Sequence, residues 1–148
     1  MKIHTLDEID RHILQALQHN ARMNVKEIAH QVMLSSPAVA KRIQRLEEEG
    51  VILGYQVQLN PIALGLGIKA FINLEVEPQQ KAVFYPFIQK EPNVIQCNCV
   101  TGDYSMILEV LFATTNQLDN FIGTLQEFGR TKTLISFSTS VEHRGIPL

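Results

Sequence analysis

The side chains best suited to contacting nucleic acid lie in one short stretch, residues 33–46. This stretch contains three basic side chains, Lys41, Arg42 and Arg45, and no acidic one. Arginine can donate two parallel hydrogen bonds to guanine, glutamine can read adenine, and lysine or serine can hold a phosphate. The residues that we expect to contact double-stranded DNA are Ser35, Ser36, Pro37, Ala38, Lys41, Arg42, Gln44 and Arg45.

A helical projection separates these side chains from the predicted core. With Val39, Ile43 and Leu46 on the buried stripe, at about 100° per residue, Lys41 and Gln44 fall on the opposite face. The plain alternative is a solvated amphipathic helix whose charges only keep the protein soluble and whose serines serve only as caps. The elements on either side of this helix decide between the two interpretations.

The neighbouring elements predict a helix-turn-helix. Apolar spacing predicts a helix over residues 6–17, capped by Thr5 with Glu8, and a second helix over residues 25–32. A Ser-Ser-Pro turn then opens the third helix, since proline suits a first helical turn. This order presents the last helix to the DNA major groove. Alternating apolar residues over 51–59 predict a strand pair, the wing of a winged helix.

The second half of the chain predicts a ferredoxin-like β-α-β-β-α-β unit, so the fold class is α+β. Its antiparallel sheet would carry helices on one face only, and the other face needs water or a partner. We therefore expect homodimerisation through this unit. The predicted elements are strands over 68–76, 94–100, 104–113 and 131–141, and helices over 82–90 and 118–128.

A length of 148 residues allows one full domain or two small ones. We expect a helix-turn-helix domain over 1–54, a linker strand or hinge over 55–66, and an effector-binding and oligomerisation domain over 67–148. The net charge of −2 over 148 residues does not by itself announce a nucleic-acid binder. No apolar run reaches the roughly 18 residues of a membrane span, and no signal pattern opens the chain, so we expect a cytoplasmic protein with no membrane contact.

Catalytic and metal chemistry have no candidate residues. The five histidines are scattered, and no Ser-His-Asp order or glycine-rich phosphate loop is present. Cys97 and Cys99 offer two thiols where a metal site needs more ligands, so we expect them to be small core residues. We therefore predict no enzyme activity, no metal and no cofactor.

Four segments in this order resemble the Lrp/AsnC, or feast/famine, transcriptional regulators. They are LDEIDRHILQALQHNAR from residue 6, the helix-turn-helix, GYQVQLNP from residue 54, and VTGDYSMILEV from residue 100. The resemblance implies a winged helix-turn-helix DNA-binding domain and a RAM/ACT-like effector domain. It also implies homodimers that assemble into octamers or similar rings, with a small molecule, usually an amino acid, bound between dimers.

The resemblance also implies an effector pocket at the turn that begins at Thr101 and on the last strand. An amino acid needs acceptors for its ammonium and donors for its carboxylate, which Asp103 and the backbone at Gly102 can supply. The alternatives are an ordinary hairpin turn and a plain core strand. The effector candidates are Thr101, Gly102, Asp103, Tyr104, Ser105, Met106, Thr133, Leu134, Ile135 and Ser136.

Ser105 departs from the family pattern, which has a second acidic residue after the aromatic one. We therefore expect an effector other than leucine, or none. The competing hypothesis is an amino-acid-sensing regulatory protein that acts through a protein partner, which the slight net acidity favours and the basic stretch at residues 33–46 opposes.

Overall fold

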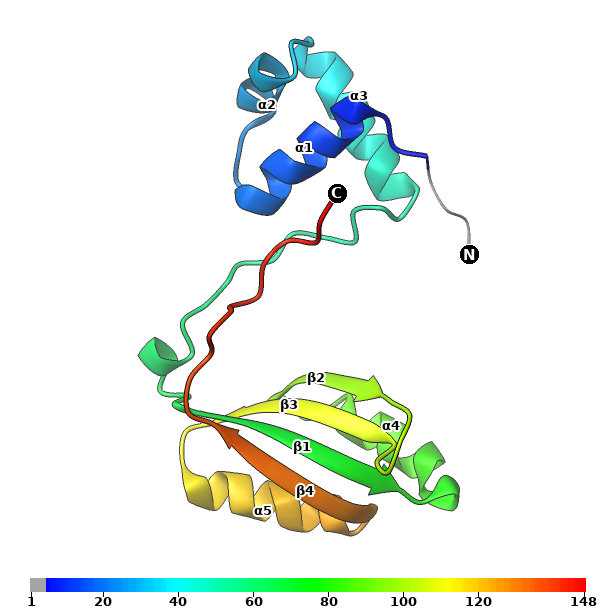
Figure 1. Cartoon of the computed structure of the whole chain (residues 1–148), viewed down its shortest axis with the longest axis vertical. Coiled ribbons are helices and arrows are strands. Elements are labelled where there is room, and N and C mark those ends of the chain that lie inside the picture. The colour runs from blue at the N-terminus through cyan, green and yellow to red at the C-terminus, as the bar shows by residue number, and fades with distance from the viewer. Residues whose placement is uncertain (1–4) are drawn as a thin grey trace. The chain divides into compact units, whose positions relative to one another are not determined.

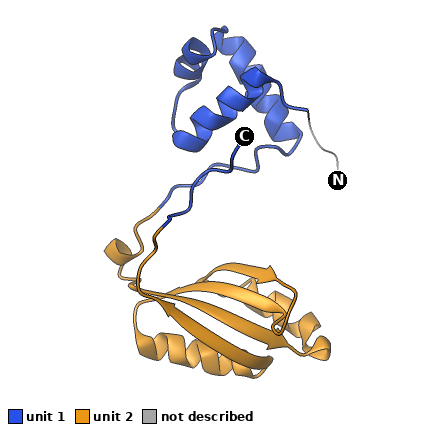
Figure 2. Ribbon diagram, in the orientation of Figure 1, with its two compact units in different colours: residues 1–58, 141–148 blue, residues 59–140 orange. Residues whose placement is uncertain are grey.

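The structure is a computed structural model that describes residues 5–148. Residues 1–4, which include His4 and the start of the predicted first domain, lie outside the described part. The chain forms two compact units (Figure 2), one that runs to Gln58 and also includes Val141–Leu148, and one formed by Leu59–Ser140.

The first unit contains three helices, α1 (Glu8–His19), α2 (Val25–Gln31) and α3 (Ser36–Glu48), as the sequence predicts. The predicted cap of α1 is wrong by two residues. Asp7, not Thr5, is the N-cap, and it forms a reciprocal capping box with Asp10. Aspartate is a strong N-cap because its carboxylate accepts directly from the free N–H groups of the first turn.

The three helices close around a small apolar core. Ile13 of α1, Ile28 and Ala29 of α2 and Val39 of α3 are buried together. Gly50, with a φ of +70°, follows the end of α3, where the Val51 and Ile52 N–H groups donate to the Leu46 carbonyl. A left-handed glycine at this position stops the helix.

The predicted strand pair over residues 51–59 does not form: among the described residues no strand begins before β1 (Ile68–Val76). Leu53 and Val57 are exposed, and the Tyr55 hydroxyl donates to Glu47 Oε1 at 2.8 Å. Alternation predicts which side chains share a face, but a strand also requires a neighbouring backbone edge. No described segment supplies that edge.

The second unit is a four-stranded antiparallel sheet in the order β2-β3-β1-β4 (Figure 1), which confirms the ferredoxin-like prediction. Two short 3-10 helices, η1 and η2, stand before β1 and α4. The elements are η1 (Ile62–Leu64), β1 (Ile68–Val76), η2 (Pro78–Gln80), α4 (Lys81–Ile88), β2 (Val94–Cys99), β3 (Met106–Phe112), α5 (Thr115–Gln126) and β4 (Gly129–Ser136).

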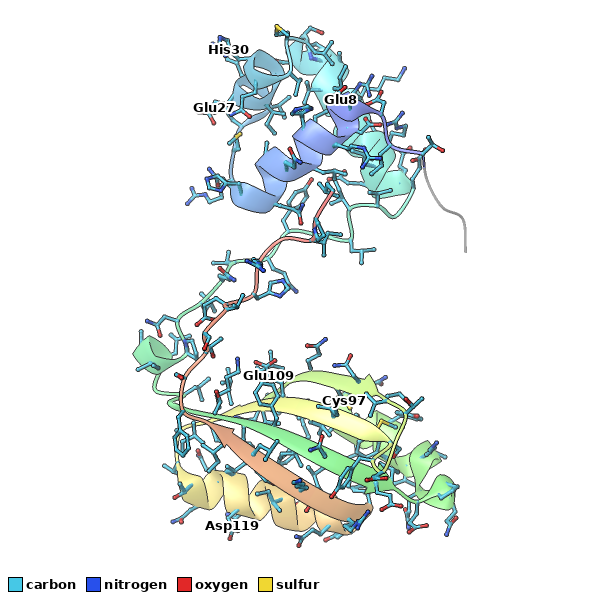
Figure 3. The ribbon with its side chains drawn as sticks, in the orientation of Figure 1. Glu8, Glu27, His30, Cys97, Glu109 and Asp119 are labelled. Atoms are coloured by element: carbon cyan, nitrogen blue, oxygen red, sulfur yellow. The ribbon has the colours of Figure 1, made fainter. Side chains whose placement is uncertain are left out.

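Helices α4 and α5 cover one face of this sheet. Phe84 of α4 and Leu125 of α5 are buried in one cluster with Ile72 of β1 and Leu108 of β3. The other face carries charges among apolar residues, and Glu109 on it forms an ion pair with Lys69 at 2.9 Å. Glu109 and the α5 residue Asp119 project from opposite sides of the sheet (Figure 3).

The two cysteines depart from the prediction of a shared core position. Cys97 is half-buried against the main cluster, and burial raises the pKa of its thiol, while Cys99 is exposed. The reason is that β2 is an edge strand with pairing only to β3, so its outer end is poorly covered.

No helix among the described residues is long and apolar enough to cross a membrane.

The end of the chain belongs to the first unit. Gln18 of α1 accepts a hydrogen bond from the Ile146 N–H at 2.7 Å and donates one to the Ile146 carbonyl at 3.2 Å. Gln58 donates to the His143 carbonyl at 2.9 Å. The last eight residues are therefore held to the helical unit by side-chain amides that bind backbone groups.

Candidate nucleic-acid interface and effector turn

The beginning of α3 is set by its turn. The Ser35 hydroxyl accepts from the Ala38 N–H at 3.4 Å, and Pro37 occupies the first turn. Ser35 is therefore the cap, and Ser36 is the first residue of the helix. Met33 takes a φ of +54°, a left-handed turn that lets the chain reverse between α2 and α3.

Lys41 and Gln44 lie on the exposed face of α3, as the helical projection predicts. Lys41 forms no ion pair with any residue that the structure describes. Gln44 Nε2 donates to Glu48 Oε1 at 2.8 Å. A shallow surface depression runs along this face and is lined by Ala38, Lys41, Arg42, Gln44, Arg45 and Glu48.

The two arginines of α3 bind carboxylates of the first helix and its cap. Arg42 Nη1 contacts Asp7 Oδ2 at 2.6 Å and Asp10 Oδ1 at 2.7 Å, and Arg45 Nη2 contacts Asp10 Oδ2 at 2.6 Å. The Asp10 side chain is only 1% exposed. Both of its oxygens are therefore satisfied by α3, as a buried carboxylate requires.

Electrostatics follow this geometry. The carboxylates of Asp7 and then Asp10 raise the pKa of Arg42, and the hydrogen bond from the Asp10 N–H, followed by that from Arg42, lowers the pKa of Asp7. Two positive charges thus face two negative ones. Of the three basic side chains of α3, Lys41 is the one without an ion-pair partner in the described part of the chain.

Sequence reasoning assigned Arg42 and Arg45 to the DNA-facing surface without recognising these partners. The position of Asp10 in the sequence could have indicated these ion pairs, because Asp10 falls on the same stripe of α1 as the buried Ile13 and Leu14. A carboxylate on an apolar stripe needs a buried partner, and the nearest basic cluster in the sequence is on α3.

The turn between β2 and β3 is anchored by Ser105. Its hydroxyl accepts from the Val76 N–H at 2.9 Å, and its own N–H donates to the Leu74 carbonyl at 3.1 Å. Gly102, in the turn itself, has a φ of +113°, a conformation that favours glycine. Ser105 therefore holds the turn to the end of β1.

The two predicted sets of effector residues are separated within one chain. The turn lies at Leu74, whereas Thr133 pairs with Ile72 and Ser136 pairs with Lys69. At about 3.3 Å per residue, this offset is roughly 7–17 Å along β1. Met106 is 1% exposed in the core, so it does not line the surface of the turn.

A cation that sequence reasoning missed lies beside the turn. The Arg130 guanidinium carbon is 5.2 Å from the centre of the Tyr104 ring, and Arg130 also binds Glu75 on β1. No sequence signal connects these three residues, since 26 positions separate Tyr104 from Arg130. The pairing of β1 with β4 places Arg130 opposite Glu75, and the Ser105 hydrogen bonds to β1 bring the neighbouring Tyr104 to the same end of the strand.

A helix-turn-helix unit joined to a ferredoxin-like unit defines a DNA-binding regulator with a ligand-binding domain. The comparisons with known families agree. Residues 6–47 match the AsnC-type helix-turn-helix domain, and residues 69–146 match the Lrp/AsnC ligand binding domain. The chain belongs to the Lrp/AsnC family of transcriptional regulators and is not an enzyme.

Individual relatives are similar over their whole length. The HTH-type transcriptional regulator LrpA of Bacillus subtilis is 34% identical, over 88% of this chain and 96% of that protein. The Neisseria meningitidis regulator NMB0573, whose structure was solved in complex with L-methionine, has 28% sequence identity to this chain. The two structures superpose with a TM-score of 0.90 over 97% of each chain. The structure of Mycobacterium tuberculosis Rv3291c with L-methionine is 30% identical, with a TM-score of 0.88 over 96% of this chain and 99% of that one.

Proposed function

We propose that this regulator binds operator DNA through the exposed face of α3, with Lys41 and Gln44 toward the major groove and the Ser35–Pro37 turn at a phosphate. The observation that carries the proposal is the position of Lys41, exposed on the side of α3 opposite the buried Val39 and Leu46. Glutamine can read adenine, and lysine can bind guanine or phosphate.

The arginines have different roles in this proposal. Arg42 is 27% exposed and binds two carboxylates, so it positions α3 against α1. Arg45 is 45% exposed, and Asp10 is its one carboxylate partner among residues 5–148, which leaves N–H groups of its guanidinium for a DNA phosphate. Asp10 would then orient Arg45 from behind.

Self-association completes the proposal. A single copy has few unpaired positive charges on α3, and phosphate neutralisation drives DNA binding. Two copies that place their α3 helices about one helical turn of DNA apart would read an imperfect palindrome. We expect homodimers that assemble into an octamer or a similar ring and act in the cytoplasm.

The effector is an amino acid bound near the turn at residues 101–105. Two relatives whose structures contain L-methionine support this choice of ligand class. Because the turn and residues 133–136 are separated within one chain, a single pocket would combine the turn of one copy with residues 133–136 of another. Effector binding would then favour one assembly over another and so alter DNA binding.

Mobility shift with duplexes selected from a random library tests the DNA proposal. The double variant Lys41→Ala, Gln44→Ala should lose about 10–100-fold in affinity for the duplex. The slope of the logarithm of its binding constant against the logarithm of the salt concentration should be smaller by about one, because one phosphate contact is lost. Lys90→Ala, which removes an exposed lysine of the second unit, is the matched control. Equal affinity in the double variant and the control would overturn the assignment.

Failure of the wild-type chain to shift any selected duplex at low salt would instead favour the competing function, regulation through a protein partner.

Light scattering with and without L-methionine, repeated with the other common amino acids, tests the effector and the assembly together. A change of mass on addition of one amino acid is the expected result, and a mass that none of them changes contradicts it.

A further inference from the structure

The Arg130 guanidinium is fixed in position from two directions. Its Nε and Nη2 atoms lie 3.2 and 3.1 Å from the same Glu75 oxygen, Oε2. Its central carbon lies over the Tyr104 ring, 5.2 Å from the ring centre. A cation–π contact and a carboxylate together limit the rotation of an otherwise flexible side chain.

The backbone around Arg130 is equally constrained. Gly129 has a φ of +153°, and a Cβ atom there would lie 1.8 Å from the Glu75 carbonyl oxygen. The absence of a side chain at Gly129 allows β4 to begin this close to β1, where Arg130 pairs with Glu75. On the other side, the Ser105 hydrogen bonds to β1 hold Tyr104 in place.

Arg130 keeps unused donors. A guanidinium has five N–H groups, and Glu75 engages only Nε and Nη2. The Nη1 edge binds no residue that the structure describes, and the side chain is 64% exposed. A pre-oriented pair of N–H groups with a full charge matches the geometry of a carboxylate.

Opposite charge is available in the same turn. Asp103 is exposed one residue before Tyr104, and Gly102 places backbone groups beside it. An α-amino acid is a zwitterion, so it needs a cation for its carboxylate and an acceptor for its ammonium. The turn and the start of β4 together provide both.

We propose that Arg130, held by Tyr104 and Glu75, is the group that binds the carboxylate of an amino-acid effector at this turn. This inference rests on the proposed effector function and gives it a specific chemistry. A ligand with an ammonium but no carboxylate would gain nothing from Arg130.

Calorimetric titration of the full chain tests this role. The twenty common L-amino acids are titrated first, and the one that binds most tightly is compared with its own primary amide. Arg130→Gln should weaken binding of the acid by about tenfold or more, and binding of the amide by less than about twofold. Arg130→Lys should lie between, because it keeps the charge but not the planar fork.

Lys132→Gln is the matched control, since it removes the next cation on the same face of β4, opposite Asn73. It should leave both affinities unchanged. Equal loss for acid and amide in Arg130→Gln would mean that Arg130 only supports the fold, and unchanged binding of the acid would also overturn the inference. A wild-type chain that binds none of the twenty amino acids would overturn the effector proposal itself.

Discussion

Asp10 Oδ2 accepts a hydrogen bond of 2.6 Å from Arg45 Nη2, which joins the first turn of α1 to the last turn of α3. The same carboxylate binds Arg42 through its other oxygen at 2.7 Å. A buried acid at the base of the helix-turn-helix thus sets the orientation of the helix that we propose to read DNA.

Replacement of Asp10 by Ala should lower the free energy of unfolding of the helical unit by about 2 kcal/mol. Breaking a buried ion pair costs about 3–5 kcal/mol, and the partly exposed arginines recover part of that by contact with water. Urea unfolding followed by circular dichroism measures the change. Glu8→Gln, an exposed acid two residues earlier, should change it by less than about 0.5 kcal/mol. Equal effects of the two variants would contradict the prediction.

Acid should destabilise the contact between α1 and α3. The hydrogen bond from the Asp10 N–H, and next Arg42, lowers the pKa of Asp7 below its usual 3.8. A lowered pKa stabilises the folded state at pH values above 3.8, and this contribution disappears as the pH falls through the folded-state pKa. Thermal unfolding from pH 6 to pH 2 should therefore show a smaller pH dependence for Asp7→Asn than for the wild type. If the unfolding temperatures of Asp7→Asn and the wild type fall in parallel with pH, Asp7 does not contribute to the acid sensitivity.

Tyr55 should titrate at unusually high pH. Partial burial of Tyr55, which is 49% exposed, and then the hydrogen bond to Glu47 raise its pKa from 10.0 to about 12. The contribution of the protonated Tyr55 side chain to the stability of the folded state is therefore complete below pH 10. It is lost as the pH rises through about 12. Phenolate absorbance in the ultraviolet, compared with Tyr55→Phe, isolates this residue. Glu47→Gln should lower its pKa only part of the way, because burial remains.

The attachment of the chain end to α1 should depend on one amide. Gln18→Ala removes both hydrogen bonds to Ile146, each worth about 1 kcal/mol, so hydrogen exchange at the Ile146 amide should accelerate. Gly145→Ala should act in the same direction, because its Cβ would lie 2.5 Å from Gln18 Oε1 and displace that side chain. Gln15→Ala, an exposed glutamine of the same helix, is the control that should leave Ile146 protected.

Local patterns predicted most of the elements of this fold. β1 has the predicted bounds, and Ser35 of the predicted Ser-Ser-Pro turn caps α3. These features depend on side chains within a few positions of one another, which sequence spacing contains directly. The wing over residues 51–59 did not form because a strand depends on a partner edge that its own sequence does not specify.

The same distinction between local patterns and long-range contacts applies to the candidate sites. The sequence alone determined the helix-turn-helix, the order of the sheet elements and the family, because periodicity, caps and turn residues act locally. Only the tertiary structure decided that Asp10 holds Arg45, that Met106 is in the core, and that Arg130 lies over Tyr104. The physical reason is that partners far apart in sequence are selected by helix packing and strand register, which bring charges and rings within contact distance.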